Sequence, residues 1–153
     1  TILKLPGQRH VWDVRKGKYL GYSDAIPVQL DQEAKFLALC PEKPVSIDLE
    51  ARLDKSDNSP KTISAGNRLE VIGKIGFAGG SSGAGIGQVV HCRVFGPGGE
   101  ELEWFRQNVV FQGATFPLVL PLSQSAKVGS YRVVVKHALS GTVGETVFQV
   151  RKP

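Results

Sequence analysis

Hydrophobic and polar residues alternate along much of the chain, and this alternation is its strongest structural signal. In the clearest run, over 45–53, five hydrophobic residues alternate with polar ones: Val45, Ile47, Leu49, Ala51 and Leu53. Because successive side chains of a strand point to opposite faces, the run predicts a strand with one buried face. Similar stripes predict strands over 26–30, 69–77, 131–136 and 148–150, and shorter ones over 9–14, 18–22, 34–40, 88–96, 101–111 and 115–122.

Helical periodicity is absent from the sequence. No window of about a dozen residues repeats hydrophobic residues at the i, i+3, i+4, i+7 spacing of an amphipathic helix. Turn signals instead interrupt the chain about every ten residues, including glycine-containing turns at 15–17, 96–99 and 139–141. Many short strands separated by turns predict an all-β fold, an antiparallel sandwich or barrel. Folds with helical crossovers between parallel strands are excluded within this chain.

A polar segment divides the chain. Residues 55–61 read KSDNSPK and include no large hydrophobic residue, which is typical of a linker. We therefore expect a short antiparallel β segment over 1–54, a linker over 55–61, and an immunoglobulin-like β-sandwich over 62–153, a length that suits seven strands. The first segment is small for an independent core, so we expect it to pack on the sandwich or on another body.

The composition is that of a folded globular protein and narrows the possible partners. The chain has 153 residues, of which 41% are hydrophobic and 22% charged, and it has no run of about 18 apolar residues that would cross a membrane. Its net charge is +5, but the cations are scattered and no nucleic-acid-binding motif accompanies them. We therefore expect no nucleic-acid partner and no membrane span.

The chain begins with Thr1 rather than Met, so we interpret it as a processed chain or a fragment of a longer polypeptide.

Catalytic chemistry has no recognisable basis in the sequence. His10, His91 and His137 each lie in a strand-like run without a nucleophile motif nearby. The glycine-rich stretch 76–87 lacks the Lys-Ser or Lys-Thr of a phosphate-binding loop, and it precedes a strand rather than a helix. No spacing typical of a metal site occurs. We predict that the chain itself is not an enzyme, and we expect no catalytic residue, no metal and no cofactor.

The two cysteines, Cys40 and Cys92, lie in hydrophobic runs that resemble strands. Buried free thiols that act as small hydrophobic side chains are the favoured interpretation. A disulfide would require the fold to bring their Cα atoms within about 7 Å of each other, which the sequence does not decide.

Sugar binding would need exposed aromatic rings, and the candidates are Trp12, Tyr19, Tyr22, Trp104 and Phe105. We expect Trp12 to be buried in the core. Trp104 and Phe105 are consecutive, so strand geometry would point one side chain inward and the other outward. This pair is the candidate contact for a sugar or a protein, and packing in the core or beside a hairpin is the alternative.

Two stretches of the chain resemble known bacterial modules. Residues 10–41, HVWDVRKGKYLGYSDAIPVQLDQEAKFLALCP, resemble the strands that end the β-domain behind the catalytic barrel of large bacterial glycoside hydrolases, β-galactosidase-like or amylase-like. Residues 66–150 resemble the immunoglobulin-like module that follows this β-domain. The matching pieces are 95–99 (FGPGG), 118–122 (LVLPL), 129–133 (GSYRV) and 148–150 (FQV). The stretch 76–87 departs from the even strand of such modules.

The resemblance implies a non-catalytic, C-terminal accessory region of a larger exported polypeptide, located outside the cell or in the periplasm. It implies that the partner is the upstream catalytic domain of the same polypeptide, with polysaccharide as a further candidate. No catalytic residue carries over, because the matching motifs are structural. A carbohydrate-binding module and a cell-surface adhesion or protein-interaction module are the alternatives.

Overall fold

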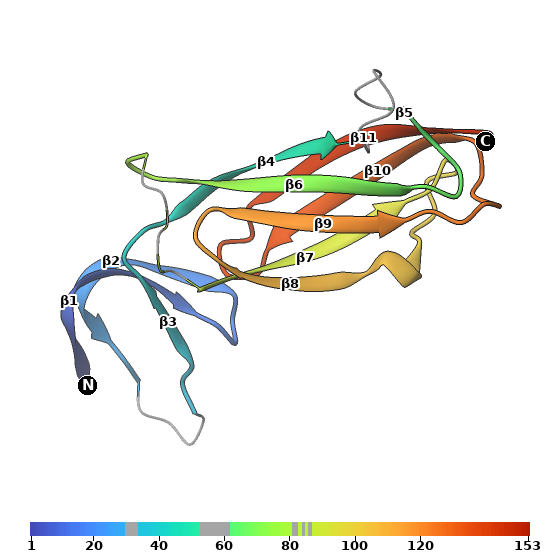
Figure 1. Cartoon of the computed structure of the whole chain (residues 1–153). Helices are drawn as coiled ribbons and strands as arrows, with labels where there is room; N and C mark the ends of the chain where they lie inside the picture. The colour runs from blue at the N-terminus through green and yellow to red at the C-terminus, as the bar shows by residue number, and fades with distance from the viewer. Residues whose placement is uncertain (30–33, 53–61, 81–82, 84, 86) are drawn as a thin grey trace.

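The computed structural model describes residues 1–29, 34–52, 62–80, 83, 85 and 87–153. Within these residues the regular structure consists of strands and one short 3-10 turn, so the all-β prediction is confirmed (Figure 1). The strands form three sheets, of which one is N-terminal and the other two face each other as a sandwich.

The sandwich combines a five-stranded sheet with a three-stranded sheet. The larger sheet has the order β5 (Thr62–Ser64), β11 (Val143–Arg151), β10 (Gly129–His137), β7 (Gly87–Phe95) and β8 (Gln107–Gln112). The smaller sheet has the order β4 (Pro44–Arg52), β6 (Arg68–Phe77) and β9 (Thr115–Pro121). Neighbouring strands are antiparallel, except that β5 runs parallel to β11.

Alternate side chains of both sheets fill the space between them. Every second residue is buried along β6 from Leu69 to Phe77, and along β10 from Tyr131 to His137. The most deeply buried side chains come from both sheets and include Leu69, Val71, Val90, Val94, Phe116, Leu120, Val133, Val135 and Phe148. Burying a side chain of this kind contributes about 1.5–3 kcal/mol. The alternation along the sequence is therefore what assembles the two layers.

The distribution of strands is that of an immunoglobulin-like sandwich. β6 and β9 lie in one sheet and β7, β10 and β11 in the other, as strands B and E oppose strands C, F and G in that fold. Tyr131, near the start of β10, donates a hydrogen bond from its hydroxyl to the carbonyl oxygen of Lys127 at 2.9 Å. This is the tyrosine corner of such domains. The prediction of an immunoglobulin-like sandwich is confirmed.

β4 belongs to the sandwich and not to the segment before it. It pairs antiparallel with β6, with Ile47 opposite Ile75, and Ile47 is buried in the sandwich core. The stripe over 45–53 revealed a strand with one apolar face, but not the strand that would pair with it. The first segment is therefore shorter than the expected 1–54, and the expected linker 55–61 lies outside the described residues.

The N-terminal sheet has the order β2 (Lys18–Pro27), β1 (Ile2–Asp13) and β3 (Leu37–Cys40), with antiparallel pairing throughout. It lies at the end of the sandwich where β4 begins (Figure 1). Its buried hydrophobic side chains are separate from the sandwich core, namely Val11, Trp12 and Ile26. The sheet therefore has a small core of its own.

The two cysteines lie in different sheets and are free thiols, as the favoured interpretation predicted. Cys92 is fully buried in the sandwich, and burial raises the pKa of its thiol to about 11. Cys40 is half-buried in the N-terminal sheet, and burial raises its pKa as well. Both thiols therefore stay protonated near neutral pH and act as small hydrophobic side chains.

The glycine-rich stretch 76–87 joins two strands of opposite sheets. It begins inside β6 and ends at the first residue of β7. Residues 81, 82, 84 and 86 of this stretch lie outside the described residues.

Candidate binding site

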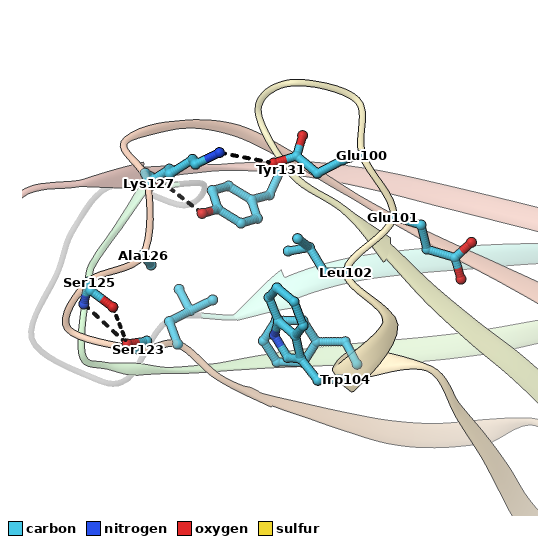
Figure 2. A pocket seen from close by; sticks show the side chains of 11 residues that line it. Glu100, Glu101, Leu102, Trp104, Ser123, Ser125, Ala126, Lys127 and Tyr131 are labelled. Carbon is cyan, nitrogen blue, oxygen red and sulfur yellow. Dashed lines mark hydrogen bonds and ion pairs between the residues drawn. The ribbon is translucent and has the colours of Figure 1, made fainter.

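A pocket lies between two connections at one end of the sandwich (Figure 2). These connections are at the end opposite the N-terminal sheet (Figure 1). The volume of the pocket is about 430 Å³, and it lies between the connection from β7 to β8, residues 96–106, and the connection from β9 to β10, residues 122–128. The lining residues are Glu100, Glu101, Leu102, Trp104, Phe105, Leu122, Ser123, Ser125, Ala126, Lys127 and Tyr131. Trp104 and Phe105, the aromatic pair that the sequence predicts as a contact for a sugar or a protein, are both among them.

A glycine-rich turn folds the first connection back beside β7. The N–H of Gly96 donates to the carbonyl oxygen of Glu100 at 2.8 Å, and the N–H of Gly99 donates to the carbonyl oxygen of Gly96 at 2.9 Å. Gly99 has a φ of +83°, a conformation that favours glycine. The N–H of Leu102 then donates to the carbonyl oxygen of Val94 at 2.8 Å, so the returning chain is anchored to the sheet.

The chain next forms a 3-10 turn over Glu103–Phe105, where the sequence predicted part of a strand over 101–111. The N–H of Phe105 donates to the carbonyl oxygen of Leu102 at 3.0 Å and fixes the turn. Phe105 points inward and is 8% exposed, whereas Trp104 points outward and is 75% exposed. The expectation of one inward and one outward side chain is confirmed, although a turn produces it rather than strand alternation.

Hydrophobic side chains form the floor of the pocket. Leu102, Phe105, Leu122 and Tyr131 are all buried, and Trp104 stands beside them with its indole reaching solvent (Figure 2). The ring centroids of Trp104 and Phe105 lie 6.0 Å apart, with an angle of 50° between the ring planes. The indole is therefore a separate exposed surface and is not stacked flat on the buried ring.

Polar side chains surround this floor. The hydroxyl oxygens of Ser123 and Ser125 lie 2.8 Å apart, and the N–H of Ser125 donates to the Ser123 hydroxyl at 3.2 Å. Across the pocket, Lys127 Nζ lies 3.6 Å from Glu100 Oε1 (Figure 2). Hydroxyl, ammonium and carboxylate groups thus all border the pocket.

Two arginines bind the second carboxylate of the site. Glu101 forms ion pairs with Arg93 and with Arg106, the latter at 2.9 Å. The hydrogen bond from Arg93, together with Arg106, lowers the pKa of Glu101 to about 2. The pKa of Glu100 is lowered by a hydrogen bond from its own backbone N–H and further by Lys127. Both groups are therefore ionised near neutral pH.

The other aromatic candidates gather in the N-terminal sheet. The ring centroid of His10 lies 6.1, 5.9 and 4.6 Å from those of Trp12, Tyr19 and Tyr22. In a regular strand, Tyr19 and Tyr22 would point to opposite faces, because they are three positions apart. The pairing of β1 with β2 shifts between Gly21 and Tyr19, so both rings reach the same cluster. Trp12 is buried, as expected. The ring planes are tilted by 32–51°, so the rings form a packed cluster and not a flat platform.

A second candidate surface is an apolar face of the N-terminal sheet. Val11 lies opposite Leu39 in the pairing of β1 with β3, and Leu39 is 41% exposed. Leu20 is also 41% exposed, and together with Leu37 it lines a hollow of about 250 Å³. We name these four residues, Val11, Leu20, Leu37 and Leu39, the Val11 face, of which Leu20 and Leu39 are exposed, Leu37 is partly buried and Val11 is fully buried.

The remaining candidate chemistry is dispersed. His10 lies in the N-terminal sheet, His91 is exposed on β7, and His137 is buried at the end of β10. Among the described residues, no group of three or more His, Cys, Asp or Glu side chains is placed to hold a metal ion. The described part of the chain also contains no helix with the length and apolar character needed to cross a membrane.

Comparisons with known proteins identify no family for this chain, because neither a protein-family model nor a curated protein matches it. One similar solved structure is the CARDB domain of a Pyrococcus furiosus protein in complex with di-metal ions, with 14% identity, a TM-score of 0.41, and coverage of 69% of this chain and 86% of that one. An immunoglobulin-like protein from Pseudomonas aeruginosa is 14% identical, with a TM-score of 0.40 and coverage of 70% and 93%. A β-glucosidase from Listeria innocua is 16% identical, with a TM-score of 0.36, and the match covers 69% of this chain but 16% of that one. Similarity at this level carries no functional argument.

Proposed function

We propose that the chain is a non-catalytic accessory module of a larger exported polypeptide, and that its N-terminal sheet packs against another domain of that polypeptide. The sequence resemblance supports a glycoside hydrolase-like catalytic domain as this partner. The paired state of Glu100 and Glu101 supports the non-catalytic role, because glycoside hydrolysis needs one carboxyl group that stays protonated until it acts.

The exposed hydrophobic side chains of the N-terminal region carry this proposal. Of the fourteen exposed large hydrophobic side chains among the described residues, seven lie between positions 2 and 39: Ile2, Leu3, Val14, Leu20, Tyr22, Phe36 and Leu39. Single exposed hydrophobic residues are ordinary, but half of the set in the first 39 residues is a concentration that favours cover by another body. Two members of this set, Leu20 and Leu39, belong to the Val11 face, and Leu20 borders the hollow.

The small core of the N-terminal sheet supports the same conclusion. A three-stranded sheet with few buried side chains is marginally stable unless a further layer packs on it. Covering the exposed parts of Leu20 and Leu39 would contribute on the order of 1 kcal/mol each. Lys16, Lys18 and Lys35 border the hollow beside Leu20, together with one carboxylate, Asp13, so a partner surface with acidic residues around an apolar centre would fit it.

The test compares the isolated chain with the whole polypeptide that contains it, using the double variant Leu20→Asp/Leu39→Asp. In the whole polypeptide the new carboxylates would be buried at the domain contact, so we expect the melting temperature to fall by roughly 5 °C or more. In the isolated chain both positions already reach solvent, so we expect a much smaller shift.

Val147→Asp is the matched control, because Val147 is also 41% exposed but lies in β11 of the sandwich. We expect it to leave both melting temperatures nearly unchanged. If the double variant shifts the isolated chain and the whole polypeptide equally, or if the control has the same effect, the Val11 face is not a domain contact.

A further inference from the structure

The exposure of Trp104 stands apart from the burial of the other tryptophan. Its side chain is 75% exposed, whereas Trp12 is 2% exposed. The backbone beneath it is fixed, because the N–H groups of Phe105 and Arg106 donate to the carbonyl oxygens of Leu102 and Glu103 at 3.0 Å each. A large aromatic side chain held out to solvent by a rigid turn is preorganised to bind a partner, and little further ordering of the backbone is needed.

The pocket beside this ring combines an apolar floor with hydroxyl groups. Leu102, Leu122 and Tyr131 are buried beneath it, and Ser123 and Ser125 border it. The two serine hydroxyls are hydrogen-bonded to each other and also lie at the surface, so each retains capacity for a further hydrogen bond. A ligand that fits both features has an apolar face and several hydroxyl groups.

The charges around the pocket already have partners. Glu100 is paired with Lys127, and Glu101 with Arg93 and Arg106. An anionic or cationic ligand would have to displace one of these ion pairs. Exchanging one solvent-exposed ion pair for another contributes little binding free energy. The electrostatics therefore favour a neutral ligand.

From these three observations we infer that the pocket beside Trp104 binds a neutral saccharide. One face of a pyranose ring would stack on the indole, and its hydroxyl groups would reach Ser123, Ser125 and the carboxylate of Glu100. The volume of about 430 Å³ suits a small ligand of one or two sugar rings. This inference goes beyond the packing role proposed above and does not depend on it. The connections that line the pocket and the N-terminal sheet lie at opposite ends of the sandwich (Figure 1).

The experiment is calorimetric titration of the whole chain with six neutral oligosaccharides: cellohexaose, laminarihexaose, maltohexaose, mannohexaose, xylohexaose and chitohexaose. We expect saturable binding of at least one of them with a dissociation constant of about 1 mM or lower. Trp104→Ala should weaken this binding at least about tenfold, because it removes the stacking surface. Because Trp104 is outside the core, the variant should melt within a few degrees of the wild type, which checks that it is folded.

Tyr22→Ala is the matched control, because Tyr22 is also an exposed aromatic side chain, at 53%, but lies in the N-terminal sheet. Tyr22→Ala should leave the affinity for the oligosaccharide unchanged. In the wild type, added NaCl should have little effect on the affinity, because the ligand is neutral. The inference is overturned by the absence of saturable binding up to about 10 mM of every oligosaccharide. It is equally overturned by binding that survives Trp104→Ala. An affinity that falls steeply as NaCl is added would also contradict it, because binding of a neutral ligand does not depend on ion pairing.

Discussion

At the scale of single residues, His137 illustrates how the sandwich fixes the charge state of a buried group. It is 1% exposed, and its Nδ1 accepts a hydrogen bond from the N–H of Ser140 at 3.0 Å. The ring proton therefore lies on Nε2, which is 2.7 Å from Oε1 of the buried Gln88 and donates to it. Burial lowers the pKa of His137 from 6.5 to about 4, so the ring is neutral in the folded protein near neutral pH.

This lowered pKa predicts a loss of stability in acid. Between pH 6.5 and about 4 the unfolded chain binds a proton at His137 that the folded chain does not bind. The free energy of unfolding therefore decreases as the pH is lowered through this window. The loss attributable to this group is on the order of 3 kcal/mol. Urea denaturation at a series of pH values measures it.

His137→Gln is the comparison for this measurement, because the amide does not titrate and still offers a hydrogen bond to Gln88. The variant should be less stable at pH 7 but should lose less stability than the wild type as the pH falls to 4. His10, whose pKa is also lowered, contributes equally to both proteins and cancels. Parallel curves for the two proteins would show that His137 does not carry the pH dependence.

At the scale of strands and turns, β4 shows how closely the two sheets of the sandwich approach. Gly144 of β11 lies against Ile47 of β4, and a Cβ atom added at Gly144 would lie 2.8 Å from the Cβ of Ile47 and closer still to its carbonyl oxygen. Only glycine fits between these two strands without a shift of the backbone. The contact ties β4 to the last strand of the opposite sheet.

Gly144→Ala should therefore lower the free energy of unfolding by roughly 1–3 kcal/mol, because the methyl group meets the backbone carbonyl oxygen and the branched Cβ of Ile47, which have little freedom to move. Gly87→Ala is the control, since Gly87 also lies in a strand and an added Cβ atom there meets nothing within 4 Å. That substitution should change stability by less than about 1 kcal/mol. Chemical denaturation of both variants makes the comparison, and similar losses for the two would contradict the close approach of β4 and β11.

The sequence was sufficient to predict most strands but not how they pair. The stripe around Ile47 identified a strand because alternation is a local property, whereas its pairing with β6 depends on the whole fold. The sequence predicted the turn that carries Trp104 as part of a strand. In both a strand and a 3-10 turn, two consecutive side chains can point one inward and one outward, so the pair Trp104 and Phe105 does not distinguish them. The meeting of Tyr19 and Tyr22 depends on a shift in strand pairing at Gly21 that leaves no clear periodic signal.

At the scale of the whole molecule, the two ends of the sandwich have different surfaces. One end carries the N-terminal sheet, and the other carries the connections 96–106 and 122–128 (Figure 1). The first end exposes Leu20 and Leu39 of the Val11 face, and the second holds the pocket beside Trp104. The pocket itself was not predictable, because its second wall, residues 122–128, comes from a connection distant in sequence from Trp104. The arrangement favours attachment to a neighbouring domain at one end and ligand contact at the other.

Hydrogen–deuterium exchange tests the central claim of attachment most directly, when the isolated chain is compared with the whole polypeptide that contains it. Local stability sets the exchange rate of a strand's amides, so a sheet that gains a packed layer exchanges more slowly. We predict that β1, β2 and β3 exchange at least about tenfold more slowly in the whole polypeptide. The amides of β7 and β10 at the centre of the sandwich should exchange equally in both. Equal exchange of the N-terminal sheet in both proteins would contradict the proposal that this sheet packs against another domain.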